Sequence, residues 1–137
     1  MNDYMRDQEV EDVKQMLRDG EWTHSATITC PKDHVSYWDV IEKIGIRMDR
    51  LRKIDNHASW IFVVNVNRDD ERKRPHAHGV INTKASSEDV QKVMMQGFEH
   101  CRAFSNKKDR HGWFDYILDH AITGTTQHNL QREMVCN

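Results

Sequence analysis

Hydrophobic side chains recur at helical spacing in two stretches of the first half of the chain. Apolar residues repeat every three or four positions across residues 3–19 and again across residues 36–54, which predicts two helices. Gly20 would end the first of them. Between them, residues 22–30 alternate in polarity, are rich in threonine and are followed by Pro31, so they predict a strand.

The middle of the chain predicts a β-hairpin. Residues 60–66 are apolar almost without interruption, as is typical of a central strand covered on both faces. A short charged connection separates them from residues 75–82, so we expect the two strands to pair antiparallel. Folding the hairpin about residues 70–71 places Asn65 opposite His76.

The last third of the chain predicts two further helices. The first would begin at a cap on Ser86 or Ser87, and the second would cover residues 113–121. Residues 100–104 are candidates for a short edge strand. The residues between that strand and the last helix, 105–112, are typical of a basic loop.

This order of elements predicts a single α+β domain over residues 1–137, in which helices pack on a central antiparallel sheet. Residues 1–20 would add an N-terminal helix, and residues 122–137 have the composition of a polar C-terminal tail. No internal repeat or linker divides the chain.

The composition indicates a modest core and no membrane segment. The 137 residues are 37% hydrophobic and 31% charged, and no apolar run approaches the ~20 residues that span a bilayer. Three cysteines without Cys-x-x-Cys spacing favour a reducing, intracellular compartment. The formal net charge of −2 argues against a uniformly basic nucleic-acid binder, so contact with DNA would need a local basic patch.

Residues 74–81, Arg-Pro-His-Ala-His-Gly-Val-Ile, contain the candidate metal ligands. Side chains alternate between the two faces of a strand, so His76 and His78 point the same way. Two imidazoles on one face suit two ligands of a single metal ion. The alternative is a surface strand that carries two histidines by chance, because short motifs match by chance often.

The predicted last helix carries the candidate nucleophile. Helical spacing places Trp113, Tyr116, Ile117 and His120 on one face. A tyrosine buried in the core would produce the same pattern. Beside a metal held by two histidines, however, a tyrosine oxygen can attack phosphorus and form a covalent intermediate that conserves the bond energy. A phenol, with a reference pKa of about 10, ionises more readily than a serine hydroxyl.

Three motifs in this order resemble those of the HUH endonucleases, most closely the nuclease domain of rolling-circle replication initiators (Rep). Residues 74–81 are similar to the metal motif of that family, and residues 25–31, Ser-Ala-Thr-Ile-Thr-Cys-Pro, are similar to its first motif. Tyr116 follows the histidines by roughly forty residues, where the Rep branch keeps its nucleophile. The resemblance covers residues 22–121 and implies the ferredoxin-like, RRM-like fold of the family.

The resemblance implies a metal-dependent, sequence-specific endonuclease and ligase that acts on single-stranded or hairpin origin DNA. Tyr116 would become joined to the 5′-phosphate and leave a 3′-OH that primes rolling-circle replication of a virus or plasmid. The cofactor would be Mg²⁺ or Mn²⁺, and the protein would work in the cytoplasm where that DNA replicates. The sequence has no Walker-type phosphate loop, so a separate helicase, together with the host polymerase, is an expected partner.

The third metal ligand departs from the family pattern. The family usually supplies Glu, Asp, Gln or His from the neighbouring strand. Here Asn65 is the expected ligand and Asn67 the next choice, because an amide oxygen can bind a hard cation. The alternative is that both asparagines only mark the end of the strand. Asp69 and Glu71 are less well placed.

The lysine that commonly follows the family's tyrosine is also missing. Asp119 and His120 stand at the corresponding positions. His120 shares a helical face with Tyr116 and could replace the lysine as a cation or proton donor. Lys107 or Lys108 could also supply the charge.

Basic residues before the two motifs are candidates for phosphate contacts, and solvated loop charge is the alternative. These DNA-binding candidates are Arg72, Lys73, Arg74, Lys107, Lys108 and Arg110. Trp113 could stack on an unpaired base, or be buried in the core. We expect the basic residues of helix 36–54 to be solvated and His24 to lie at the surface.

Three other functions fit parts of the pattern. One is a single-tyrosine HUH transposase, although such enzymes usually place the tyrosine further from the histidines. The second is a non-catalytic nucleic-acid-binding module with structural histidines. The third is a metal-binding regulatory protein without DNA chemistry.

Overall fold

The computed structural model describes residues 3–29, 37–65, 76–94, 100–124 and 134–136. In chain order the elements are α1 (Asp3–Asp19), β1 (His24–Thr29), α2 (Tyr37–Ile54), β2 (Ser59–Asn65), β3 (His76–Asn82), α3 (Ser87–Met94), β4 (His100–Ala103), α4 (Lys107–Gly124) and β5 (Met134–Cys136). Among the residues described, no helix is both long and apolar enough to cross a membrane.

The strands form one antiparallel sheet in the order β4-β1-β3-β2-β5. From β1 to β4 the chain follows the β-α-β-β-α-β path of a ferredoxin-like fold. This confirms the predicted α+β class and the predicted β2–β3 hairpin. β3 is the middle strand, so each of its faces lies deep in the molecule.

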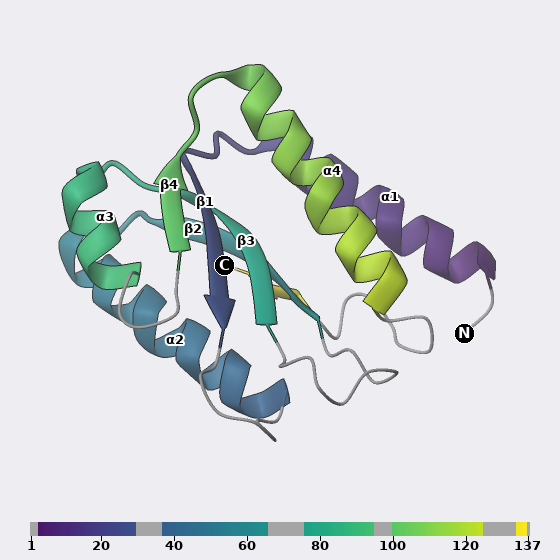
Figure 1. Ribbon diagram of the computed structural model, residues 1–137, viewed down its shortest axis with the longest axis horizontal. Helices are drawn as coiled ribbons and strands as arrows, with labels where there is room; N and C mark the ends of the chain where they lie inside the picture. Colours follow the sequence, from purple (N-terminus) through teal and green to yellow (C-terminus); the bar gives the residue numbers. More distant parts are fainter. Residues whose placement is uncertain (1–2, 30–36, 66–75, 95–99, 125–133, 137) are drawn as a thin grey trace.

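Helices cover both faces of the sheet (Figure 1). α2 and α3 enclose one hydrophobic cluster, and α1 and α4 enclose another on the opposite face. Successive residues of a strand alternate between these clusters. In β2, Phe62 and Val64 belong to the first cluster, whereas Ile61 and Val63 belong to the second. The prediction that residues 60–66 form a strand covered on both faces is therefore confirmed for β2.

α4 begins at Lys107, so the prediction of a basic loop over residues 105–112 is wrong. Asn106 caps the helix, because its side-chain oxygen accepts a hydrogen bond from the backbone N–H of Asp109 at 2.9 Å. Asp109 reciprocates by accepting from the backbone N–H of Ser105, also at 2.9 Å. The pair resembles a capping box, except that Asp109 accepts from the residue before the N-cap and not from the N-cap residue itself.

The prediction of a polar tail over residues 122–137 is also wrong in part. α4 continues to Gly124, and β5 pairs antiparallel with β2. β5 gives β2 a second neighbour. It pairs with backbone groups that β2 would otherwise leave unpaired at the edge of the sheet. Its three apolar residues, Met134–Cys136, are the sequence signal for it.

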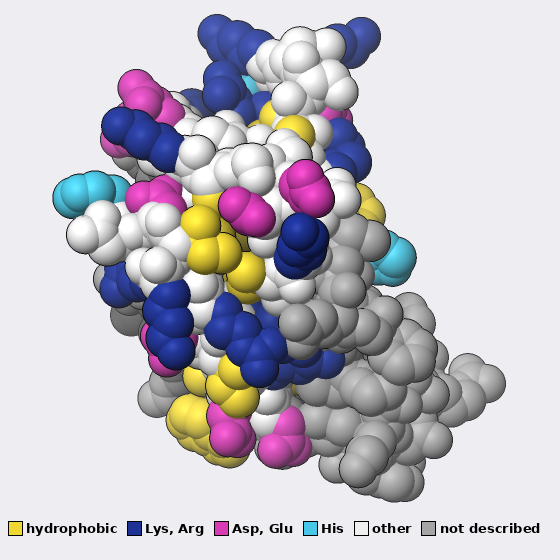
Figure 2. Space-filling model, turned by 90° about the vertical axis from the view of Figure 1, so that its left-hand side faces the viewer, with side chains coloured by type: hydrophobic (Ala, Val, Ile, Leu, Met, Phe, Trp, Pro, Cys, Tyr) yellow, Lys and Arg dark blue, Asp and Glu magenta, His cyan; other side chains and the backbone are white. Residues whose placement is uncertain are grey.

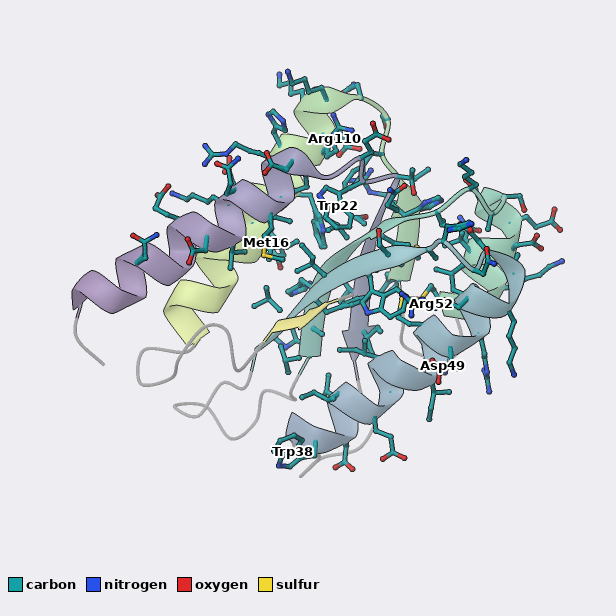
Figure 3. The ribbon with its side chains drawn as sticks, turned by 180° about the vertical axis from the view of Figure 1, so that it is seen from behind. Met16, Trp22, Trp38, Asp49, Arg52 and Arg110 are labelled. Atoms are coloured by element: carbon teal, nitrogen blue, oxygen red, sulfur yellow. The ribbon has the colours of Figure 1, made fainter. Side chains whose placement is uncertain are left out.

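The prediction that the basic residues of α2 are solvated is confirmed for Arg50 and Lys53 but not for Arg47 and Arg52, and the prediction that His24 lies at the surface is wrong. On α2, only 9% of Arg47 is exposed, and Arg52 lies over the Trp60 ring at 4.4 Å from its centroid. Figure 3 shows Arg52 on α2 alongside the sheet. His24 is also buried, and its ring nitrogens lie 2.8 Å from Thr23 Oγ1 and 3.3 Å from Ser87 Oγ. Burial lowers the pKa of His24.

Candidate active site

The two histidines of β3 lie together beneath α4. His76 and His78 alternate with residues that face α2 and α3, so both side chains are on the α1/α4 face of the sheet. Their ring centroids are 4.8 Å apart. His78 is only 7% exposed. The predicted shared face is confirmed, and the alternative of an exposed surface strand does not hold for this middle strand.

Thr27 of β1 contacts the ring of His78. The two residues are opposite each other in the β1–β3 register, and Thr27 Oγ1 lies 3.0 Å from His78 Nδ1. A hydrogen bond at Nδ1 sets the ring orientation and directs Nε2 away from Thr27. Thr27 belongs to the strand that resembles the first HUH motif, but the sequence did not identify this contact.

Tyr116 projects from α4 toward the histidines. The centroid of its ring is 5.1 Å from that of His78, and the two rings meet at 75°. Its side chain is 42% exposed, whereas the next residue, Ile117, is 2% exposed and packs in the core. The alternative of a core tyrosine is therefore excluded, and Ile117 takes the buried position that the helical pattern predicted.

Trp113 holds α4 against the middle strand. Its indole Nε1 donates a hydrogen bond of 2.8 Å to the carbonyl oxygen of Gly79. Its ring stacks on Tyr116, with centroids 5.2 Å apart and planes inclined by 20°, and meets the edge of His78 at 5.5 Å. Gly79 is required beside it, because a Cβ there would collide with the ring of Phe62. Trp113 thus restrains the tyrosine ring beside His78.

The candidate third ligand lies in the expected place along the backbone. Asn65 is directly opposite His76 in the β2–β3 register, as predicted, although its side chain lies outside the described residues. Asn67 also lies outside them. In the part of the chain that the structure describes, no three His, Cys, Asp or Glu side chains come together. The donors brought together are the two imidazoles, a set that fits two positions of a divalent-cation site.

Several predicted residues lie where the structure gives no side-chain detail. His120 falls within α4, one turn after Tyr116, but its side chain is outside the described residues. Three of the DNA-binding candidates lie in the undescribed connection between β2 and β3, namely Arg72, Lys73 and Arg74.

A groove beside Tyr116 separates β4 from the first turns of α4. We call it the β4–α4 groove; the residues that line it include Arg102, Ser105, Lys108, Gly112, Trp113 and Tyr116. Of the three basic residues predicted near α4, Lys108 lines the groove, whereas Lys107 and Arg110 do not. The dark blue side chains at the top of Figure 2 mark this basic end of α4.

Arg102 is a groove residue that the sequence did not identify. It lies opposite Ser25 on the α1/α4 face, and two of its nitrogens donate to Asp109 at 2.6 and 2.7 Å. These hydrogen bonds raise the pKa of Arg102 and hold the pKa of Asp109 well below its usual range. The sequence carried no signal for Arg102, because its partner Asp109 lies on another element, α4.

No family model and no curated protein sequence matches this chain. One solved structure is similar in fold: the hypothetical protein ORF119 from Sulfolobus islandicus rod-shaped virus 1. Its TM-score is 0.50 and its sequence identity 15%, and the match covers 82% of this chain and 93% of that one. At this level of identity the similarity concerns the fold alone, so this chain shares its α+β architecture with that viral protein.

Proposed function

We propose that this protein is a metal-dependent DNA-nicking endonuclease and strand transferase of the HUH type, which initiates rolling-circle replication of a virus or plasmid. The observation that supports the proposal is the contact of an exposed tyrosine ring with His78, whose ring in turn lies against that of His76. Tyr116 comes from α4 and His76 and His78 come from β3, yet the ring of Tyr116 lies 5.1 Å from that of His78.

His76 and His78 would hold the metal ion, with Asn65 as the third ligand. A bound Mg²⁺ or Mn²⁺ supplies Lewis-acid polarisation of a phosphodiester through a non-bridging oxygen. Thr27 acts as a positioning residue, because its hydroxyl restrains the ring of His78.

Tyr116 would be the nucleophile. Its oxygen forms a bond to phosphorus while the bond from phosphorus to the 3′-oxygen breaks, so the DNA is left with a free 3′-OH and a 5′-phosphotyrosine link. The phenol loses its proton as this bond forms, and the departing 3′-oxygen gains one. The reverse reaction rejoins the strand. His120, one helical turn further on, is our candidate for moving these protons.

The exposure of Tyr116 favours this proposal over a non-catalytic nucleic-acid-binding module. A structural tyrosine would gain from burial, but here the adjacent Ile117 and Leu118 are buried while Tyr116 remains 42% exposed. A non-catalytic module would also retain its full function when the phenolic oxygen of Tyr116 is removed.

The test is formation of a covalent protein–DNA adduct. The protein is mixed with Mn²⁺ and labelled single-stranded origin DNA, and the products are separated on a denaturing gel. We expect an adduct that disappears with Tyr116→Phe and with the double substitution His76→Ala/His78→Ala. Tyr37→Phe, which removes a phenol from α2 on the other face of the sheet, is the matched control and should keep the adduct. An adduct that survives Tyr116→Phe would refute the role of this tyrosine.

A further inference from the structure

We propose that the β4–α4 groove binds one unpaired nucleotide next to the scissile phosphate, with its base against Trp113 and its phosphate near Lys108 and Arg102. This inference rests on the proposed nicking function, and it adds to it the surface that selects single-stranded DNA. The groove contains Tyr116 in its wall, so a strand lying in it passes directly over the nucleophile.

The size of the groove fits one nucleotide. Its volume is about 560 Å³, within the range of sites that bind small ligands. A second hollow of about 250 Å³ adjoins it, since both are lined by Arg102 and Trp113, and it extends toward Thr27 and His100. The two hollows give the strand a path from Tyr116 across the outer strands of the sheet.

The floor of the groove is open near the nucleophile. Gly112 lies one turn before Tyr116 and one turn after Lys108 on α4. A Cβ placed on Gly112 would meet no heavy atom within 4 Å. The space above Gly112 is therefore available to a bound nucleotide.

The basic residues of the groove differ in how they are held. The side chain of Arg102 is 55% exposed and gives two of its five N–H donors to Asp109, so its guanidinium is fixed in place with donors left for a phosphate. Within the described part of the chain, Lys108 makes no ion pair, and its side chain is exposed. Lys108 therefore brings uncompensated positive charge to the groove.

Trp113 supplies a rigid aromatic surface. Its hydrogen bond to Gly79 restrains the indole, and one face of the ring is already stacked on Tyr116. Because the indole is already restrained, little side-chain entropy is lost when a base stacks on it. Every base has a face that can stack in this way. Bases of a duplex are stacked on one another, so only an unpaired base can reach this ring.

The first test compares lysines that differ in position. All variants carry Tyr116→Phe, and binding of a short fluorescein-labelled oligothymidylate is followed by fluorescence anisotropy in EDTA at several salt concentrations. Lys108→Ala should weaken binding and reduce the slope of log K against log salt by about 0.7, the value for one phosphate contact to a single strand. Lys107→Ala removes the same charge one residue away, outside the groove, and should lose less affinity for the oligonucleotide.

Lys92→Ala is the control for the opposite face of the sheet, since Lys92 lies on α3. It should bind the oligonucleotide as the parent does. Equal losses for Lys108→Ala and Lys107→Ala would overturn the proposal, because they would indicate only general attraction to the basic end of α4.

The second test concerns the aromatic ring. Trp113→Ala should weaken single-strand binding on the order of 10-fold, as expected for one lost base stack, and leave binding of a matched duplex unchanged. Trp113→Phe keeps a ring and should retain most of the affinity. Thermal unfolding of each variant verifies that it is folded. An equal loss for duplex and single strand would overturn the proposal.

The two proposals fail in distinguishable ways. If no adduct forms but Lys108 and Trp113 discriminate as above, the nicking chemistry is wrong and the groove is a binding site for single strands. If an adduct forms and neither residue discriminates, the chemistry stands and the nucleotide lies elsewhere.

Discussion

At the scale of single residues, one hydroxyl connects the candidate metal site to its neighbouring strand. Thr27 Oγ1 lies 3.0 Å from Nδ1 of the buried His78, and no helix is involved in that contact. Groups that restrain a ligating imidazole set its tautomer and its orientation. The proposed metal site should therefore be sensitive to Thr27 although Thr27 would not bind the ion.

We predict that Thr27→Val lowers the affinity for Mn²⁺ by about 10- to 100-fold, the usual effect of losing such a partner. Valine keeps the β-branched shape, so the strand should be unaffected. Titration calorimetry measures the affinity, and Thr27→Ser, which keeps the hydroxyl, should restore it. Unchanged affinity in Thr27→Val would show that the hydroxyl does not position His78 for the metal.

At the scale of elements, one carboxylate ties the end of α2 to the segment that follows β3. Asp55 Oδ2 accepts hydrogen bonds from Thr83 Oγ1 at 2.7 Å and from the backbone N–H of Lys84 at 2.9 Å. Its Oδ1 accepts from the backbone N–H of His57 at 3.0 Å. The bond from Thr83, followed by those from the two backbone groups, lowers the pKa of Asp55.

This contact predicts a dependence of stability on pH. Because the pKa of Asp55 is lower in the folded state, its stabilisation is present above the unfolded pKa of about 3.9 and is lost as the pH falls below that value. Asp55→Asn should therefore melt at a lower temperature than the parent near neutral pH, and the difference should shrink in acid.

Thermal unfolding followed by circular dichroism between neutral and acidic pH measures this effect. Asp49→Asn, which changes an exposed carboxylate within α2 (Figure 3), is the control. A melting difference for Asp55→Asn that stays constant across the pH range would contradict the prediction.

At the scale of the whole molecule, packing on both faces of the sheet depends on one residue of the middle strand, Gly79. On one side of Gly79 the ring of Phe62 occupies the space of a missing Cβ. On the other side the Gly79 carbonyl accepts the hydrogen bond from Trp113, which positions Tyr116. Packing against α2 and α3 is thus connected to the geometry beneath α4.

We predict that Gly79→Ala destabilises the protein by about 1–3 kcal/mol, the usual cost of overfilling a packed core. The added methyl meets both the Phe62 ring and the backbone oxygen of Ile61, and backbone cannot turn aside as a side chain can. Urea unfolding measures the loss. Gly112→Ala, at a glycine with open space around it, should not cause a comparable loss. Equal stability of the two variants would contradict the close-packing account.

The local parts of this structure could be predicted from the sequence. The alternation of side chains along a strand placed His76 and His78 on one face, and the short connection paired β2 with β3 so that Asn65 lies opposite His76. Both results depend on residues close together in the chain. Helical spacing likewise located the second half of α4, but it could not distinguish the buried Ile117 from the exposed Tyr116.

Only the tertiary structure decided which distant segments meet. The order β4-β1-β3-β2-β5 depends on backbone hydrogen bonds between segments far apart in sequence. That order brings Thr27 to His78 and adds β5 to the sheet. Asn106, which caps α4, also lines the groove beside Tyr116. Local patterns determine the face on which a side chain lies, whereas long-range pairing and packing determine what that side chain meets.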